Sequence, residues 1–431
     1  MKGRPWKAAG WWLAALIALF LVSYMFANWV AGLRANLPSL TFAWERQLPF
    51  LAWTIVPYWT SDLLYGLSIF LCRTREELEV HARRLVAVQL ISVAAFLLYP
   101  MQCAFVRPPV EGLFGFMFKA LMGIDRPFNQ APSLHVSLAV LLGAKFDQHL
   151  TGWPRWFMRG WFALIVVSAM TTYQHQFVDL PTGIWTGLLC LALFPYPRRT
   201  VTLVPRSARS IRIAGAYLAG GLTFAIAAFG MSGIALLLLW PAGALLVVSG
   251  VYWTGRVDLF GKSEGRMPAS VQWLLAPYVA GAWINSRLWT LGQPPAREIA
   301  DGVWLGRVPG DAAGFASLVD LTAEIPVNTQ GLPYRAEPLL DLIPPAPAQL
   351  ASAVRAIEEL APHRPTLVFC ALGYSRSAAA VAAWLAATGR AESPEAAVAM
   401  LAEKAPSIVL GPQHQANIGN CAYAEEVRDE V

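Results

Sequence analysis

One short segment, TLVFCALGYSRSAAA (366–380), carries residue types that can transfer a phosphoryl group. Its β-rich run ends at Cys370, and a helical pattern follows from Ser377, so the intervening loop lies at a helix N-terminus. Backbone N–H groups in such a loop curl around an anion, and the helix end and Arg376 favour a thiolate. The thiolate is a nucleophile, and a guanidinium can hold two phosphate oxygens at once. Gly373 permits a loop geometry that a side chain would obstruct, and Ser377 can donate a hydrogen bond to the leaving sulfur.

A leaving alkoxide or phenoxide also needs a proton. Asp341, in PLLDLIPPAP, follows a short strand and precedes a proline-rich loop, which predicts a mobile general acid. Asp320, in SLVDLTAE, lies at a strand end with capping residues after it and is interpreted as structural. The alternative is that Cys370 is a small buried residue and Arg376 a solvated charge, but the combined spacing of Cys, Gly, Arg and Ser favours catalysis.

A second group of reactive residues lies in the apolar part of the chain. The segments KALMGIDRPFNQ, PSLH and YQHQFVDLPTG contribute Lys119, Arg126, Ser133, His135, His175 and Asp179. A helical turn would place Asp179 beside His175, where a carboxylate fixes the imidazole tautomer and makes the other nitrogen a better base or nucleophile. His135 can protonate a leaving oxygen, and the basic residues can neutralise phosphate. The alternative is that these histidines cap helices near lipid headgroups, but two histidines at membrane depth favour a site.

The elements that must position these residues begin with a membrane domain. Of 431 residues, 56% are hydrophobic and 14% charged, with 18 Trp, which excludes an ordinary soluble protein. We expect eight spans, each of about 20 helical residues, near 9–30, 49–71, 85–105, 132–147, 156–173, 179–196, 211–230 and 232–254. Basic residues gather in every second connection, so both termini are predicted to be cytoplasmic. The net charge of +6 is scattered between apolar runs, which argues against a nucleic-acid partner.

The composition changes after residue 255, which predicts three parts. Residues 1–255 form the membrane domain, 256–295 an interfacial linker containing the apolar segment 271–289, and 296–431 a small α/β domain. Alternating strands and helices predict a parallel central sheet in that last domain. The five cysteines show no metal-binding spacing, and neither a disulfide framework, a metal nor a cofactor is expected.

The thiol segment resembles the cysteine-dependent dual-specificity phosphatases, whose signature is C-x5-R-S, over about residues 300–415. The resemblance implies that Cys370 is the nucleophile and forms a phosphocysteine, that Arg376 binds the phosphate, and that Asp341 acts first as acid and then as base. Phe369 stands where that family usually has histidine before the cysteine.

The membrane segments resemble the type 2 phosphatidic acid phosphatase superfamily, whose motifs read K-x6-R-P, P-S-G-H and S-R-x5-H-x3-D. The resemblance implies that His175 is a phosphohistidine nucleophile, His135 the acid and Asp179 the orienting carboxylate. It also implies that Lys119, Arg126 and Ser133 bind phosphate. Leu134 and Ala169 replace a motif glycine and arginine. The segments DRPFN (125–129) and PSLH (132–135) are also similar to the inositol-phosphorylceramide and sphingomyelin synthase branch, whose members transfer a headgroup phosphate to an alcohol.

These patterns together predict an integral membrane phosphatase with two phosphoryl-transfer sites, a histidine site outside and a thiol site in the reducing cytoplasm. The expected partners are the bilayer and a phospholipid or lipid-phosphate substrate. Three alternatives stay open: a headgroup transferase fused to a lipid phosphatase, a membrane-anchored protein phosphatase with an inactive membrane site, and a phosphate-binding module.

Overall fold

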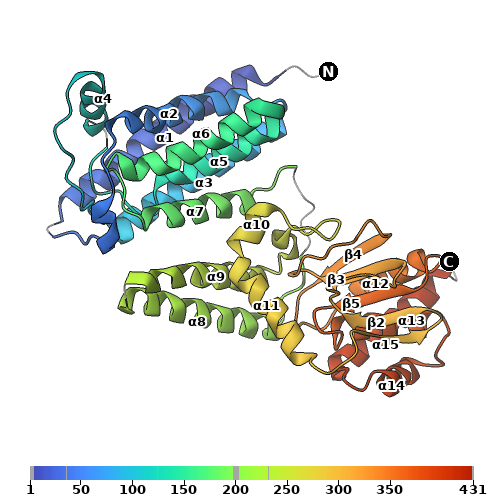
Figure 1. Cartoon of the computed structure of the whole chain (residues 1–431). Coiled ribbons are helices and arrows are strands. Elements are labelled where there is room, and N and C mark those ends of the chain that lie inside the picture. Colours follow the sequence, from blue (N-terminus) through green and yellow to red (C-terminus); the bar gives the residue numbers. More distant parts are fainter. Residues whose placement is uncertain (1–3, 35, 124, 198–202, 232, 430–431) are drawn as a thin grey trace. The chain divides into compact units, whose positions relative to one another are not determined.

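A computed structural model describes residues 4–34, 36–123, 125–197, 203–231 and 233–429 (Figure 1). The chain forms two compact units. The first unit comprises Met1–Arg199 and Met231–Leu236, and the second comprises Thr200–Gly230 and Leu237–Val431. These units divide the chain elsewhere than at residues 255 and 295, so the three-part domain division stays a prediction.

The first unit is a helical bundle. Its helices are α1 (Trp6–Gly32), α2 (Ile55–Phe70), α3 (Arg75–Leu98), α4 (Gly112–Met122), α5 (Leu134–His149), α6 (Gly152–Thr171) and α7 (Asp179–Leu193). Two glycines of α7 let it approach α5 closely. A Cβ on Gly183 would lie 2.7 Å from the carbonyl oxygen of Ser133, and one on Gly187 would lie 2.9 Å from that of Ser137. This approach brings the N-terminal ends of α5 and α7 together, where the backbone N–H of Ser133 donates to the carbonyl of Asp179 at 3.1 Å.

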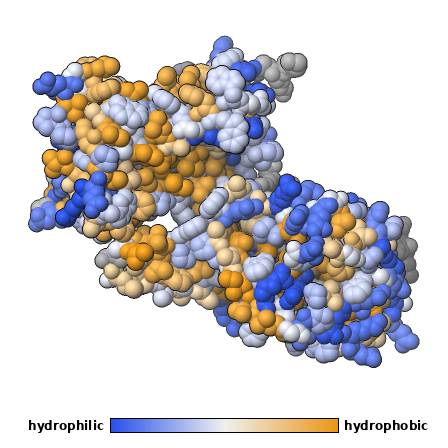
Figure 2. All heavy atoms as spheres, viewed as in Figure 1, coloured by the Kyte–Doolittle hydropathy of each residue, from blue (hydrophilic) through white to orange (hydrophobic). Residues whose placement is uncertain are grey.

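Helices occupy all eight segments predicted as spans, but they differ in length. Within the described ranges, four helices are long and apolar enough to cross a membrane: α1, α3, α8 (Ala208–Met231) and the helix Gly233–Thr254, which contains α9 (Leu239–Thr254). The others are shorter or less apolar, so the count of eight spans remains a prediction. Hydrophobic residues gather on the visible surface of the helical parts (Figure 2).

The second unit continues from α8 and α9 through α10 (Ala269–Leu274) and α11 (Ala276–Trp289) into a five-stranded sheet. Its strands are β1 (Ala296–Ala300), β2 (Val303–Arg307), β3 (Ser317–Thr322), β4 (Tyr334–Leu339) and β5 (Thr366–Cys370), in the order β1-β2-β5-β3-β4. The remaining helices are α12 (Pro347–Leu360), α13 (Arg376–Ala387), α14 (Pro394–Lys404) and α15 (Pro412–Asp429).

The sheet is mixed, which corrects the expectation of a parallel one. The strands β2, β5, β3 and β4 pair in parallel, but β1 pairs with β2 in antiparallel fashion. The cause is a two-residue turn at Asp301 and Gly302, which have φ of 46° and 73°. An Asp-Gly pair with both φ positive is typical of a tight β-hairpin.

The central strand β5 is buried along its whole length and alternates its side chains between two cores. Val368 and Cys370 belong to the core that includes α12 and α13, whereas Leu367 and Phe369 belong to the core on the other side of β5. Because β3, β4 and β5 run parallel to one another, their carboxyl ends lie at the same edge of the sheet. In parallel sheets, the loops at this edge commonly hold functional groups.

The apolar segment 271–289 forms α10 and α11. Pro277 lies in the first turn of α11, where its missing N–H costs no hydrogen bond, so it begins the helix. The side chains of Trp283, Ile284, Leu288 and Trp289 are exposed. This exposed apolar surface is compatible with the predicted interfacial segment.

Candidate active sites

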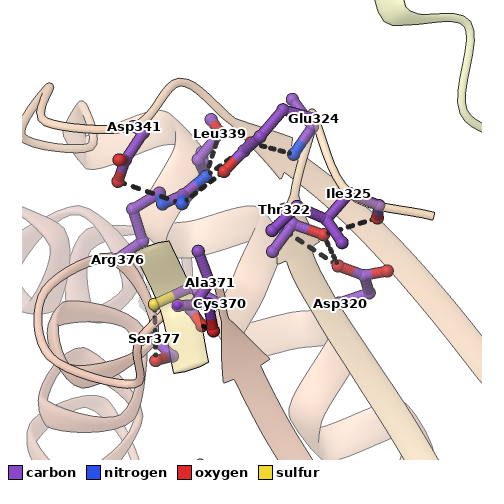
Figure 3. A network of polar contacts seen from close by, with 12 residues as sticks. Asp320, Thr322, Glu324, Ile325, Leu339, Asp341, Cys370, Ala371, Arg376 and Ser377 are labelled. Atoms are coloured by element: carbon purple, nitrogen blue, oxygen red, sulfur yellow. Dashed lines mark hydrogen bonds and ion pairs between the residues drawn. The ribbon is translucent and has the colours of Figure 1, made fainter. Parts of the chain in front are cut away.

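The thiol of Cys370 lies where β5 ends and faces the first turn of α13 (Figure 3). Its sulfur accepts hydrogen bonds from the backbone N–H of Gly373 at 3.3 Å and from the hydroxyl of Ser377 at 3.2 Å. The residue is only 3% exposed. Two donors aimed at one sulfur stabilise negative charge on it, which a nucleophilic thiolate and a departing thiolate both require.

Gly373 brings the thiol loop against the neighbouring strand β2. Its φ is +81°, and a Cβ there would lie 2.8 Å from the carbonyl carbon of Gly306. Both the dihedral and the backbone contact exclude an ordinary side chain. The curl of the loop around the sulfur therefore depends on glycine at this position.

Arg376 is 1% exposed and extends from the start of α13 toward the ends of β3 and β4 (Figure 3). Its Nη1 and Nη2 donate to the two carboxylate oxygens of Glu324 at 3.0 and 2.7 Å. Nη1 also donates to the carbonyl of Leu339 at 2.9 Å, and Nη2 lies 3.0 Å from Oδ1 of Asp341. Nε is buried without a partner. Glu324 therefore fixes the Nη1–Nη2 edge of the guanidinium, and Asp341 adds a second contact to Nη2 while Nε has no partner.

Glu324 and Arg376 each stabilise the charged form of the other. Burial favours the neutral form of Glu324, but the charge and hydrogen bonds of Arg376 outweigh burial and lower the Glu324 pKa below its usual value. Burial opposes the charged form of Arg376 as well, yet Asp341 and Glu324 raise its pKa well above the ordinary value. Glu324 was absent from the predicted site; the only sequence signal for it is an acidic residue just after β3.

The two candidate acids occupy different environments. Asp341 lies in the loop after β4 and is half-buried, with its carboxylate beside Arg376. Asp320 is fully buried and pairs with Lys262, Tyr334 and the backbone and hydroxyl of Thr322. Figure 3 shows its network apart from the sulfur. The interpretation of Asp320 as structural fits these contacts.

Helix α11 supports the thiol loop from outside the sheet domain's core. The hydroxyl of Ser286 donates to the carbonyl of Ala371 at 2.5 Å, and the hydroxyl of Tyr374 donates to the carbonyl of Trp289 at 2.9 Å. No local pattern predicts these two contacts, because each joins residues 85 positions apart.

The histidine group in the first unit is partly assembled. Nδ1 of His175 lies 3.1 Å from Oδ2 of Asp179, and Nε2 lies 3.1 Å from the hydroxyl of Ser133. The Asp179 carboxylate also accepts from the backbone N–H of Gln176 at 2.9 Å. Glu45, which the sequence analysis did not include, accepts the backbone N–H of Phe177 at 2.7 Å and so fixes the same turn. The hydroxyl, imidazole and carboxylate form one hydrogen-bonded chain.

His135 has different partners from those of His175. Its Nε2 lies 2.6 Å from the hydroxyl of Ser61 and 3.1 Å from the carbonyl of Tyr58, and its ring stacks on Tyr58 with centroids 3.8 Å apart. Lys119 and Arg126 are exposed. Arg107, not predicted as part of the site, donates to the carbonyl of Thr172 at 3.1 Å, three residues before His175.

Solved structures similar to this chain match about a third of it. Tk-PTP is 25% identical over 30% of this chain and 97% of its own, with a TM-score of 0.28. PTPMT1, solved in complex with PI(5)P, is 21% identical over 32% and 99%, with a TM-score of 0.29. Human DUSP28 is 23% identical over 31% and 96%, with a TM-score of 0.28. These neighbours are phosphatases, the class of enzyme that the sequence analysis predicted.

No family model matches the chain, and no curated protein matches it.

Proposed function

We propose that the second unit hydrolyses phosphate monoesters through a phosphocysteine at Cys370. The thiolate attacks phosphorus while the bond to the leaving oxygen breaks, and Asp341 gives that oxygen its proton. A water molecule then attacks the phosphocysteine and loses its proton to Asp341. The sulfur departs as a thiolate stabilised by Ser377 and Gly373, and inorganic phosphate is released.

The observation that carries this proposal is the arrangement of hydrogen-bond acceptors around Arg376. Glu324 holds one edge of the guanidinium, so the fork cannot swing away from the sulfur. A substrate phosphate would take the Nε–Nη2 edge, displacing the Asp341 carboxylate from Nη2. Bidentate binding of this kind suits phosphate geometry. Displacement also frees Asp341 to move toward the leaving oxygen. Once the carboxylate is away from the guanidinium charge, it can take up from solvent the proton that it then donates.

The proposed substrate is a lipid phosphate at the cytoplasmic membrane surface. Helix α8 and the helix Gly233–Thr254, which contains α9, are long and apolar enough to span a membrane. Residues 208–230 of α8 and the whole of α9 belong to the same compact unit as the thiol site. We place both termini in the cytoplasm because basic residues gather in every second connection of the eight proposed spans. A phosphoprotein is the alternative substrate.

For the first unit we propose phosphoryl transfer on phospholipid headgroups at the outer side. His175 would attack phosphorus through Nε2, Asp179 would orient the ring through Nδ1, and Ser133 would hold a phosphate oxygen. The support is the hydrogen-bonded chain from Ser133 to Asp179. His135 keeps its proposed role as acid, and Arg107 joins Lys119 and Arg126 as a candidate partner for phosphate. An inositol-phosphorylceramide synthase-like transfer to an alcohol is the alternative to hydrolysis.

The test offers a panel of phospholipids to the full chain in detergent, with Cys370→Ser and His175→Ala in parallel. We expect each variant to lose a different activity. If phosphotyrosine peptides are turned over faster than any lipid, and only through Cys370, the chain is a membrane-anchored protein phosphatase. If neither substitution removes any phosphate release, both site assignments are wrong.

A further inference from the structure

A helix long and apolar enough to span a membrane makes a direct hydrogen bond to the loop that carries the proposed general acid. Tyr252, near the C-terminal end of α9, donates its phenolic hydroxyl to the backbone carbonyl of Asp341 at 3.0 Å. Tyr252 is 1% exposed, so water does not compete for this bond. Both residues belong to the second unit.

Asp341 is thereby held at two points. Its carboxylate is 3.0 Å from Nη2 of Arg376, and its carbonyl is 3.0 Å from the hydroxyl of Tyr252. When a phosphate displaces the carboxylate from Arg376, the bond to Tyr252 is the contact that remains. The side chain then swings about a backbone that is still anchored, which limits the positions that the carboxyl can reach.

The Tyr252 hydroxyl is itself a fixed point. The hydroxyl of Ser249 donates to the carbonyl of Ala214 on α8 at 2.8 Å, and the ring of Tyr217 lies 5.4 Å from that of Tyr252. Gly255 ends α9 in the left-handed region, so close to Val204 that a Cβ would lie 2.1 Å from its carbonyl oxygen. These contacts fix both the rotation and the end of α9.

We infer that Tyr252 is a positioning residue for Asp341, and that α9 therefore sets the efficiency of proton donation at the thiol site. The inference rests on the proposed phosphocysteine mechanism. It gives α9 a role beyond anchoring: any displacement of that helix along its axis is transmitted to the acid loop through one hydrogen bond.

The dependence of the rate on the leaving group separates this role from a general structural one. Phenyl phosphate expels a strongly basic oxygen and needs the acid, whereas 4-nitrophenyl phosphate expels a weakly basic one and needs it little. The measured quantity is kcat/KM, because it reports the step that forms the phosphocysteine. The full chain in detergent is compared with Tyr252→Phe, which keeps the ring, and with Thr254→Val, which removes a hydroxyl bonded only within α9.

We expect Tyr252→Phe to lower kcat/KM for phenyl phosphate roughly three- to tenfold, the effect of one neutral hydrogen bond. The value for 4-nitrophenyl phosphate, and both values for Thr254→Val, should stay unchanged. In an Asp341→Asn background, Tyr252→Phe should have no further effect, because coupled residues are not additive.

Equal losses on both substrates, no loss on phenyl phosphate, or additivity with Asp341→Asn would overturn the inference. Cys370→Ser is measured alongside to keep the two proposals distinct. If that variant remains active, the phosphocysteine mechanism itself fails. If it is inactive while Tyr252→Phe does not distinguish the substrates, only the role of Tyr252 fails.

Discussion

Replacing Glu324 by glutamine tests whether the buried carboxylate is what aims Arg376 at the sulfur. In the native chain the two carboxylate oxygens accept from Nη1 and Nη2 at 3.0 and 2.7 Å, with both side chains almost fully buried. Glutamine keeps one acceptor oxygen and turns an NH2 group toward the other guanidinium nitrogen. One charge-assisted hydrogen bond is lost, and two donors are placed against each other.

The loss of one hydrogen bond to a charged group costs about 1.5–3 kcal/mol of unfolding free energy. We expect about 2–3 kcal/mol, below the roughly 3–5 kcal/mol for removing a buried partner outright, because one acceptor remains. For a unit of this size the melting temperature should fall by about 4–12 °C. A fork displaced by about 1 Å should lower kcat/KM about a hundredfold.

The assay follows thermal unfolding of the purified full chain in detergent, together with kcat/KM for 4-nitrophenyl phosphate. The matched control is Glu359→Gln, which disrupts a two-point ion pair with Arg335 at the surface, where the Glu359 side chain is 53% exposed. Such exposed pairs contribute less than about 1 kcal/mol, and kcat/KM should not change. If Glu324→Gln melts and turns over like the native chain, Arg376 is positioned by something other than this carboxylate.

Four further outcomes are expected. Gly373→Ala should abolish phosphocysteine formation, detected by trapping labelled phosphate, because its Cβ would lie 2.8 Å from the Gly306 backbone. Ser377→Ala should slow phosphocysteine breakdown about tenfold, because its hydroxyl lies 3.2 Å from the sulfur; absence of a burst in rapid-quench kinetics would contradict this. Asp179→Asn should reduce turnover of phospholipids by the first unit while leaving 4-nitrophenyl phosphate hydrolysis intact; a parallel loss of both activities would argue against separate sites. The Glu324 pKa is lowered, so the stabilisation that its charged form contributes should be complete above the usual glutamate pKa of about 4.3. That contribution should be lost as the pH falls through the lower pKa of the folded chain. A melting temperature that already declines at pH values above about 4.3 would contradict this expectation.

The thiol loop was predictable because its groups lie within eight residues of one another, between a strand and a helix that the pattern already indicates. The contact between His175 and Asp179 was predictable because the two residues are only four positions apart, although a non-helical turn ahead of α7 joins them in place of the predicted helical turn. The antiparallel β1 was also locally encoded, in the Asp301–Gly302 pair, but the α/β alternation took precedence in the interpretation.

The residues that sequence analysis missed act over long separations. Glu324 is 52 positions from Arg376, and Tyr252 is 89 positions from Asp341, so each contact exists only once the helices and the sheet have packed. Lys119 and Arg126 were included in the site from local sequence spacing alone. Their spacing matches a motif, yet both side chains are exposed, while Arg107 lies beside the turn that carries His175.

The hydrogen bond from Ser286 to the Ala371 carbonyl bears on where the catalytic part of this chain begins as an autonomous piece. A fragment that begins at residue 296 would retain all five β-strands and Cys370. It would, however, leave the Ala371 carbonyl without its donor Ser286 and the Tyr374 hydroxyl without its acceptor, the Trp289 carbonyl. A fragment that keeps the thiol loop and its α11 partners together should therefore start upstream of α10, inside the segment 256–295 that composition assigns to a linker, and it would still lack Tyr252 of α9.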